Sequence, residues 1–474
     1  MPGARSNIGS PVNISQGKGG YFGTYNWTGF SGAAKCPNGD LLYAGCCGSE
    51  AMAVSATCKT DFLRCPAGSD PKIAANWVQQ SRVGFVDGVQ EIWMRTFTDA
   101  AGTFMLLSGN ANVGYGPSGP TNVDWYQQGY FSRSLDNGAT WDTASSFVIS
   151  DRPNIRLRDG SGDQQQDQTG GFVQLLDGSI IMPVEIVPFG NRNRETTYQI
   201  LVRSTDRGAT WTTYGGQPFT TVTNWNWSEA SLIWLPDGRL ACMARVKEDP
   251  LLTADDYTMW MSYSSDAGLT WGNQTRCIRR AASRPIEVVG PEGDLLVAYR
   301  TVTLAQASGP TAWRQSWDGG ATWTNPVDIG VLSANIYGQG ILLDSRPGVD
   351  GNVGFVYQEQ TAQGYAYFMS LTKPAGWVAG LIVTPSTVWS QSGTTVTAAK
   401  APRLTRTTTT AQVNSSAGGL IQFRGTHASR FSVSLDGTTW ASSVTVPAGT
   451  STIYLGVTPQ GGDTTLTAQI GIPA

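Results

Sequence analysis

The stretch Ser134-Leu135-Asp136-Asn137-Gly138-Ala139-Thr140-Trp141 follows the pattern Ser-x-Asp-x-Gly-x-Thr-Trp, and this pattern decides the fold. Further copies run from Ser204 to Trp211, from Ser264 to Trp271 and from Ser316 to Trp323. Serine and aspartate side chains cap the backbone of a tight turn, and glycine adopts positive φ without a steric penalty. Threonine suits the outgoing strand, and tryptophan buries a large rigid surface against a neighbour. The pattern therefore predicts a hairpin turn that occurs once in each repeated structural unit.

The aspartates of these copies, which we expect to be structural, recur at intervals of roughly 50 to 70 residues, as in a repeated supersecondary unit. They are Asp136, Asp206, Asp266 and Asp318. A second, weaker signal consists of two apolar stretches around a glycine-containing turn. It occurs at Gly39, Gly88, Gly178, Gly238, Gly293 and Gly351. Since a turn of this kind between apolar runs favours a hairpin, we predict an all-β chain with a six-bladed β-propeller over residues 21–377.

The two ends of the chain differ from this repeated region. Residues 1–20 are expected to form an N-terminal extension. From residue 378 to 474 the sequence is rich in threonine, serine, valine and glycine, with alternating strand-like runs such as Phe431–Leu435. We predict an immunoglobulin-like β-sandwich there. The turn Ser434 to Trp440 is one residue shorter than the repeated pattern, and we interpret it as a hairpin of the sandwich.

Composition narrows the class of function. The chain has 474 residues, of which 57 are glycine and 17 tryptophan, and a net charge of −3, which argues against nucleic acid as the main partner. The single histidine, His427, makes histidine-based metal sites and Ser-His-Asp catalysis improbable in the main body, so we expect no metal or other cofactor. No apolar run reaches the ~18 residues of a membrane span, and no signal peptide is visible.

Five of the seven cysteines crowd into one stretch, and this suggests local disulfides and an extracellular or virion setting. They are Cys36, Cys46, Cys47, Cys58 and Cys65. Zinc ligation and free buried thiols are the alternatives. A protein outside the cell without a visible signal peptide would either have lost that signal or reach the outside by another route, such as assembly into a virus particle.

The repeated turns resemble the Asp-boxes of the sialidase (neuraminidase) superfamily, and residues 20–375 look like its six-bladed propeller. The boxes indicate the scaffold far better than the activity, because they lie on the outer rim and occur in glycosidases and lectin-like receptors alike. Sialidases hold the substrate carboxylate with three arginines, and a glutamate activates their tyrosine nucleophile. A separate aspartate serves as the acid/base. Guanidinium groups suit this task because they match a carboxylate bidentately.

Part of that constellation is found in this sequence. The run from Trp227 through Glu229, with Arg245 sixteen residues after the glutamate, resembles the family's fourth-blade motif. The resemblance implies that Glu229 assists the nucleophile and that Arg245 binds a carboxylate. It also implies that Tyr337 is the nucleophile. In the alternative interpretation, Glu229 and Arg245 form a structural ion pair and Tyr337 packs between blades.

The hairpin glycines provide a second way to find the site. The positions seven residues beyond them are Cys46, Arg95, Glu185, Arg245, Arg300 and Gln358. If the repeats are in register, these side chains project around one mouth of the propeller, where ligands commonly bind. Arg300 is then the second anion-binding arginine, Arg95 a third, and Glu185 a further substrate-binding residue. Alternatively, such residues pair with neighbouring acids at the surface.

Other residues depart from the family pattern or remain open. The family's first arginine is absent, because its place reads Phe30-Ser31-Gly32-Ala33-Ala34. The acid/base is unassigned, with the following candidates: Glu50, Asp61, Asp70, Asp163 and Asp167. Trp227 and nearby aromatic residues could stack on sugar rings or pack between blades.

Three functions remain open. The first is glycan binding or adhesion on a virion or cell surface, with glycans that include acidic sugars as partners. The second is a retaining exo-glycosidase of sialidase type, with Tyr337 and Glu229 as catalytic residues. The third is a structural virion component, for which homo-oligomers or virion assembly are expected. The absence of a visible signal peptide, the clustered cysteines and the threonine- and serine-rich C-terminal region together resemble tailed-phage fibre proteins.

Overall fold

The computed structural model describes the following residues: 5, 7, 10–18, 27–48, 59–80, 89–113, 126–143, 145–152, 155–156, 164–188, 196–235, 238–248, 257–272, 274–290, 294–302, 310–329, 336–343, 353–359, 365–371, 377–378, 381–383, 389–392, 395–399, 407–415, 419–424, 431–446, 449–457 and 465–473. Strands dominate this part of the chain, and its one helical segment is the short 3-10 helix η1 (Ala74–Asn76). In the described residues, no helix has the length and apolar character that crossing a bilayer needs. The chain is therefore all-β, as predicted.

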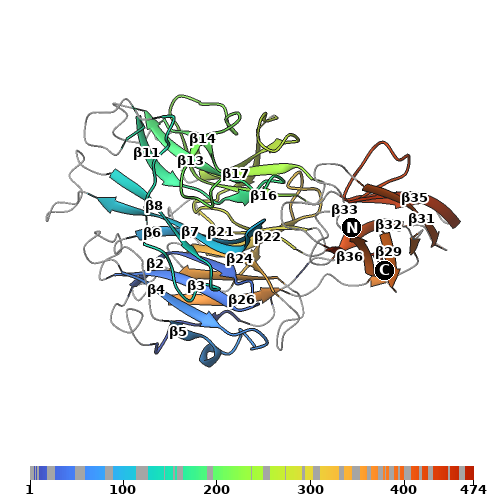
Figure 1. The fold of residues 1–474 in the computed structure, drawn as a ribbon, viewed down its shortest axis with the longest axis horizontal. Helices are drawn as coiled ribbons and strands as arrows, with labels where there is room; N and C mark the ends of the chain where they lie inside the picture. Colours follow the sequence, from blue (N-terminus) through green and yellow to red (C-terminus); the bar gives the residue numbers. More distant parts are fainter. Residues whose placement is uncertain are drawn as a thin grey trace.

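Six sheets follow one another along the first part of the chain (Figure 1). Sheet 1 contains β2 (Trp27–Lys35), β3 (Leu41–Gly48), β4 (Lys59–Cys65) and β5 (Val78–Gln80). Sheet 2 contains β6 (Val89–Asp99), β7 (Gly102–Val113), β8 (Tyr126–Ser134) and β9 (Ser145–Ser146). Sheet 3 contains β10 (Ile155–Arg156), β11 (Gln164–Thr169), β12 (Val173–Gln174), β13 (Ile180–Pro188), β14 (Tyr198–Ser204) and β15 (Thr212–Thr213). Sheet 4 contains β16 (Trp225–Trp234), β17 (Leu240–Glu248), β18 (Tyr257–Ser264) and β19 (Thr275–Arg279). Sheet 5 contains β20 (Ile286–Val289), β21 (Leu295–Arg300), β22 (Thr311–Ser316) and β23 (Val327–Asp328). Sheet 6 contains β24 (Ile336–Leu342), β25 (Val353–Glu359), β26 (Tyr365–Leu371) and the N-terminal β1 (Val12–Asn13).

These sheets contact one another in chain order. Strand β2 contacts β6, β8 contacts β11, and β11 contacts β16. Strand β16 in turn contacts β20, and β20 contacts β24. Strand β24 of the last sheet contacts β2 of the first, so the succession of contacts returns to its start. The first strands β2, β6, β16, β20 and β24 each take part in these contacts between sheets.

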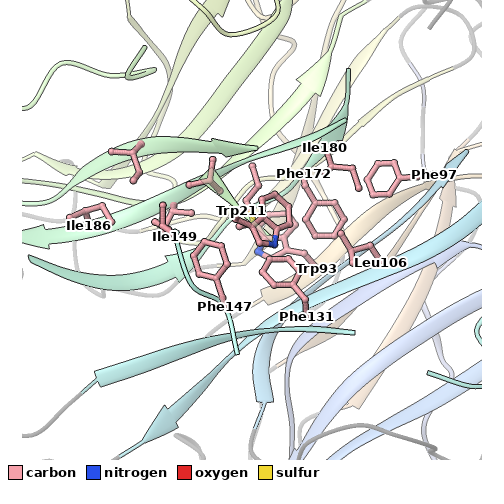
Figure 2. Packing of buried hydrophobic residues seen from close by; sticks show 14 of the residues in the cluster. Trp93, Phe97, Leu106, Phe131, Phe147, Ile149, Phe172, Ile180, Ile186 and Trp211 are labelled. Carbon is pink, nitrogen blue, oxygen red and sulfur yellow. The ribbon is translucent and has the colours of Figure 1, made fainter. Parts of the chain in front are cut away.

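Buried hydrophobic side chains gather between consecutive sheets. Among the described residues, six clusters lie at the six sheet-to-sheet contacts, and one of them joins sheet 6 to sheet 1. Figure 2 shows the cluster between sheets 2 and 3, where Trp211 packs among aromatic rings. Its ring centroid lies 4.8 Å from that of Phe131 and 6.0 Å from that of Phe147. Burial of these faces is the main force that holds the sheets together.

The repeated turns adopt one structure. Each joins the last two strands of its sheet, as β8–β9, β14–β15, β18–β19 and β22–β23. In the first turn, Asp136 Oδ1 accepts hydrogen bonds from the Ser134 hydroxyl (2.8 Å) and the Thr140 amide (2.8 Å). Two successive residues, Asn137 and Gly138, have positive φ (62° and 74°). The other copies repeat these bonds, so the predicted turn chemistry is correct.

The hairpin predicted around Gly88 falls outside the described residues, and the described first hairpin of sheet 2 lies further along the chain. Strand β6 pairs with β7 through the turn at residues 100–101, with Asp99 opposite Gly102. The Ala101 amide donates to Asp99 Oδ1 (2.8 Å), and Gly102 has a φ of 121° that favours glycine. Arg95 therefore lies in the first strand of sheet 2, and it does not occupy the position that Arg245 and Arg300 share in the second strands.

The N-terminal segment completes sheet 6 and reaches into sheet 5. Strand β1 pairs antiparallel with β26. Upstream of it, Arg5 is buried and forms a bidentate pair with Asp294, with Nε 2.5 Å from Oδ2 and Nη2 2.9 Å from Oδ1. Gln315 donates to the same carboxylate (2.7 Å). These contacts tie the beginning of the chain to the last two sheets of the succession.

Two further sheets belong to the C-terminal part (Figure 1, orange to red). One contains β27 (Trp377–Val378), β29 (Trp389–Ser392), β30 (Thr395–Ala399), β32 (Gly419–Arg424), β34 (Ser443–Val446) and β36 (Thr465–Pro473). The other contains β28 (Leu381–Val383), β31 (Thr407–Ser415), β33 (Phe431–Ser434) and β35 (Gly449–Val457). All their strand pairs are antiparallel, and the short turn after Ser434 begins in β33.

The prediction of local disulfides fails at two of the crowded cysteines. Cys36 and Cys65 are buried, and neither forms a disulfide in the described part of the chain. Burial raises the pKa of Cys36 to about 12, although the nearby Arg64 guanidinium opposes this. The side chains of Cys46, Cys47 and Cys58 lie outside the described residues. Cys36 and Cys65 instead pack as small apolar side chains against neighbouring sheets.

Candidate functional site

Strand β16 carries an irregularity that presents an acidic side chain. Its pairing with β17 shifts by one residue between Ser228 and Ser231, which marks a bulge. Within the bulge, Glu229 has a φ of 51°, a left-handed conformation that is costly for a residue with a Cβ. Its side chain is only 6% exposed. Strained residues of this kind persist where the surroundings over-determine them, and they concentrate at functional sites.

An arginine of the neighbouring strand pairs with this glutamate. Nη1 of Arg245 lies 3.1 Å from Oε2 of Glu229. Nη2 of Arg245 also donates to the Ser228 hydroxyl (3.3 Å), which lies directly opposite on β16. The side chain of Arg245 is 21% exposed, so solvent reaches one part of the guanidinium while the glutamate is nearly covered.

A second arginine arrives from sheet 5. Nη2 of Arg300 donates to the backbone carbonyl of Ala282 (2.8 Å), and Nη1 of Arg245 approaches the same oxygen at 3.4 Å. Arg300 is fixed at its backbone by the Ser283 hydroxyl (2.9 Å). Two guanidinium groups from different sheets therefore meet at one carbonyl oxygen, beside the carboxylate of Glu229. Such a pair of planar donors can bind a carboxylate or another oxyanion.

A buried charged network adjoins these residues through Ser231, and the sequence patterns did not predict it. Glu287 in β20 accepts hydrogen bonds from the Ser231 hydroxyl (2.5 Å) and from Nη2 of Arg95 (3.0 Å). Arg284, also buried, lies 4.3 Å from the ring centroid of Trp93 and donates to the carbonyl of Ser31. The sequence did carry one sign of this network. Two charged residues, Arg284 and Glu287, stand just before and within the otherwise apolar strand β20.

The protonation of Glu287 is perturbed by its position. Burial raises the pKa of this carboxyl above its ordinary value, while the Arg95 charge and the Ser231 hydroxyl lower it. Burial likewise raises the pKa of Cys242, and the Glu287 charge adds to that effect. The network is thus a set of charges that the protein holds away from water by pairing them.

The remaining predicted site residues lie in different places. Arg95 meets Glu287 rather than Arg245 or Arg300. Glu185 is buried in β13 opposite Gln199, and Trp227 is fully buried, stacked 4.6 Å from Phe219. The Trp227 ring is therefore part of the core between sheets 3 and 4.

Tyr337 lies in β24 opposite Gln358, in the sheet that closes the succession. Its side chain is outside the described residues. Its proposed role as a nucleophile therefore stays a prediction.

The candidate acids are also separated. Asp61 is buried in β4 and accepts from Gln79 (2.7 Å), while Asp70 caps the turn that precedes η1. Glu50 and Asp163 lie outside the described residues, as does the side chain of Asp167. Among the residues that the structure describes, no group of three histidine, cysteine or acidic side chains could hold a metal ion.

Comparisons with known proteins find similarity over part of the chain. Residues 164–343 match the family described as BNR repeat-like domain. A sialidase from Clostridium perfringens is 28% identical over 180 residues, which are 36% of this chain and 41% of that protein. The chain thus spans less than half the length of this curated relative. Residues 164–343 are thus similar to a BNR repeat-like domain, and a segment of the chain is similar to part of a sialidase.

Solved structures show the same fold at low identity. A protein of unknown function from Dyadobacter fermentans has a TM-score of 0.57 and 14% identity, over 78% of this chain and 100% of that chain. An α-L-arabinofuranosidase from Fusarium graminearum has a TM-score of 0.54 and 14% identity, over 78% and 98%. An α-L-arabinanase from Penicillium chrysogenum has a TM-score of 0.51 and 16% identity, again over 78% and 98%.

Proposed function

We propose that this protein binds glycans through an acidic sugar at the cluster of Glu229, Arg245 and Arg300. The observation that carries the proposal is the meeting of Arg245 and Arg300 at the carbonyl of Ala282. Their side chains come from sheets 4 and 5, so the fold itself brings the two donors together. The BNR-repeat match and the sialidase relative support a carbohydrate ligand.

The scaffold we propose for this site is a six-bladed β-propeller with one blade per sheet. The contacts from each sheet to the next, and from the sixth back to the first, support it. We further propose that residues 378–474 form an immunoglobulin-like sandwich from the two C-terminal sheets. In a propeller the inner strands surround a central axis, and ligands bind where their ends converge.

The charge arrangement favours an anionic ligand over a neutral one. Glu229 compensates Arg245, and Arg300 contributes a second positive charge that touches a neutral carbonyl. A ligand carboxylate between the two guanidinium groups would accept hydrogen bonds in which donor and acceptor are both charged. Each such bond contributes about 1.5–3 kcal/mol, roughly ten- to a hundredfold in affinity.

A glycan array followed by calorimetry tests this proposal. We expect the protein to bind a sialoside or a uronide and to ignore the neutral parent sugar. Arg300→Ala and Arg245→Ala should each weaken binding at least about tenfold. Arg133→Ala is the matched control, because Arg133 pairs with Asp142 near an outer turn (2.7 Å). An array without any bound glycan would refute the proposal.

Glu229 presents its carboxylate from a strained backbone, and this favours a second function, hydrolysis by a sialidase-type retaining mechanism. Glu229 would accept the phenol proton of Tyr337 as the phenol oxygen bonds to the anomeric carbon and the glycosidic bond breaks, as in the exception to the two-carboxylate rule. A candidate acid or water would protonate the leaving oxygen, and water would then hydrolyse the glycosyl–tyrosine bond. A fluorogenic sialoside tests this directly. Turnover that Tyr337→Phe and Glu229→Gln abolish would establish catalysis, whereas binding without turnover in the unmutated protein would leave recognition as the function.

The setting of this activity is also a proposal. We propose that the protein acts in adhesion, outside the cell or on a virus particle. The clustered cysteines and the threonine- and serine-rich C-terminal region support this setting. Immunolabelling of intact cells and purified particles would decide the location. A structural virion component, the remaining alternative, would bind no glycan and would co-purify with particles as an oligomer.

A further inference from the structure

The bulge that presents Glu229 is held by sheet 3 on one side. The Gly171 amide donates to the Ala230 carbonyl (3.1 Å), and the Leu232 amide donates to the Gly171 carbonyl (3.0 Å). The approach is so close that a Cβ on Gly171 would lie 2.1 Å from the Ser231 hydroxyl oxygen. A Cβ on Gly170 would likewise lie 2.1 Å from the Ala230 carbonyl oxygen. Sheet 3 can therefore form these hydrogen bonds to the bulge only with glycine at positions 170 and 171.

Sheet 5 holds the bulge from the other side. The Ser231 hydroxyl, two residues after Glu229, donates to Oε1 of Glu287 at 2.5 Å. Both side chains are buried. Hydrogen bonds to an ionised acceptor are among the stronger ones, and their loss leaves a buried group uncompensated.

Glu287 is itself anchored across the assembly. Arg95 from sheet 2 donates to the same oxygen, Oε1, at 3.0 Å. One carboxylate therefore links sheets 2, 4 and 5. Arg284, which precedes β20, adds a fixed positive charge nearby and reaches the carbonyls of Ser31 and Ile92 in sheets 1 and 2. The position of Glu287 is thus set by several sheets rather than by its own strand.

We propose that Glu287 is a positioning residue for the candidate site, which holds Ser231 so that the bulge keeps Glu229 in its left-handed conformation against Arg245. Glu287 does not touch the ligand, and it acts through Ser231 and Glu229. For its effect on ligand affinity the inference rests on the proposed glycan function. Its effect on the conformation of the bulge is independent of that function.

The first test measures the bulge without any ligand. In Ser231→Ala, hydrogen–deuterium exchange of a peptide spanning residues 226–233 should accelerate at least about tenfold, since the strained backbone loses one of its two anchors. Ser132→Ala is the matched control. It removes a hydroxyl bond of another buried serine, from Ser132 to the Asp142 carbonyl (2.6 Å), in sheet 2. Unchanged exchange in Ser231→Ala would overturn the inference.

The second test distinguishes positioning from general stability. Glu287→Ala removes the acceptor, whereas Glu287→Gln retains an oxygen that can accept from Ser231. We expect fast exchange at residues 226–233 in the alanine variant and near-normal exchange in the glutamine variant. Equal exchange in the two variants would contradict positioning through Ser231. A crystal structure of the glutamine variant should retain the positive φ of Glu229.

The third test connects the bulge to binding. With a sialoside or uronide that the unmutated protein binds, Ser231→Ala should weaken affinity about tenfold, and Glu287→Gln should restore most of what Glu287→Ala loses. If no sugar binds the unmutated protein, the proposed function fails while the exchange tests still decide the role of Glu287. Exchange that responds as expected, with affinity unchanged, would refute the link to the site.

Discussion

Glu229 combines a strained backbone with a buried charge. Its φ of 51° is the left-handed value that glycine adopts without cost, yet the residue carries a carboxylate 3.1 Å from Arg245. A protein optimised only for stability would place glycine there. The strain therefore indicates that the carboxylate at this position has a role beyond packing.

This reasoning gives a prediction about two small substitutions. Glu229→Gly and Glu229→Ala both remove the carboxylate, but only glycine relieves the left-handed strain. We expect the glycine variant to be more stable than the alanine variant by about 1 kcal/mol, measured by denaturant unfolding. Equal free energies of unfolding would mean that the bulge relaxes when the carboxylate is removed.

The residues of the site were predictable to different degrees, for physical reasons. Glu229 and Arg245 stand on adjacent strands of one hairpin, so their spacing along the chain fixes their proximity. Arg300 stands as many residues after its hairpin glycine as Arg245 does in the preceding sheet. Glu287 contacts Arg95 over a separation of 192 residues, and no local pattern encodes such a contact. Arg95 was misassigned because residues 87–88 look like a hairpin turn while the chain turns at residues 100–101.

At the scale of elements, the repeated turns were fully predictable because their bonds are local. In the second copy, Asp206 accepts from Ser204, from the Thr210 amide and from the Thr210 hydroxyl, all within four residues. The following Trp211 then packs on the preceding sheet. Each turn thus combines a self-contained hydrogen-bond network with one large apolar contact.

Removing the central carboxylate of a turn should therefore have a moderate effect. We expect Asp206→Ala to lower the free energy of unfolding by about 1–2 kcal/mol, as the loss of a capping side chain does. Asp206→Asn, which retains one acceptor oxygen, should lose less. Chemical denaturation of the two variants measures this, and an alanine variant as stable as the parent would contradict it.

The same turns predict a pH dependence. Hydrogen bonds from the Thr270 hydroxyl and amide lower the pKa of Asp266. A carboxyl whose pKa is lowered on folding stabilises the fold above its ordinary pKa, and this contribution is lost as pH falls toward the folded value. We expect the melting temperature of Asp266→Asn to fall less than that of the parent between neutral and acidic pH. Parallel melting curves would refute this contribution.

At the scale of the whole molecule, the closed succession of sheets followed from the repeats, but the contacts of the N-terminal segment did not. The sequence placed residues 1–20 in an extension, whereas Arg5 lies buried against Asp294 with both side chains at 0% exposure. The indole of Trp313 donates to Asn7 (2.8 Å), and β1 pairs with β26. These contacts join residues some 300 positions apart and have no periodic signature.

Breaking this buried pair should be severe. We expect Arg5→Ala to lower the free energy of unfolding by about 3–5 kcal/mol, because Asp294 is left buried and charged. Arg203→Ala is the matched control, since its pair with Asp177 is partly exposed and should contribute less than about 1 kcal/mol. If the two variants lose similar free energies of unfolding, the buried pair contributes no more than the exposed one, and the prediction is wrong.

The docking of Arg5 also has a consequence for biosynthesis. Its backbone amide donates to the side chain of Gln315, a residue that follows 310 positions later. At typical translation rates, this partner leaves the ribosome tens of seconds after Arg5 does. During that interval the segment around Arg5 lacks its binding partner, and the nascent chain is open to capture by chaperones. Tags fused ahead of Arg5 should therefore lower the yield of folded protein more than tags fused at the C-terminus.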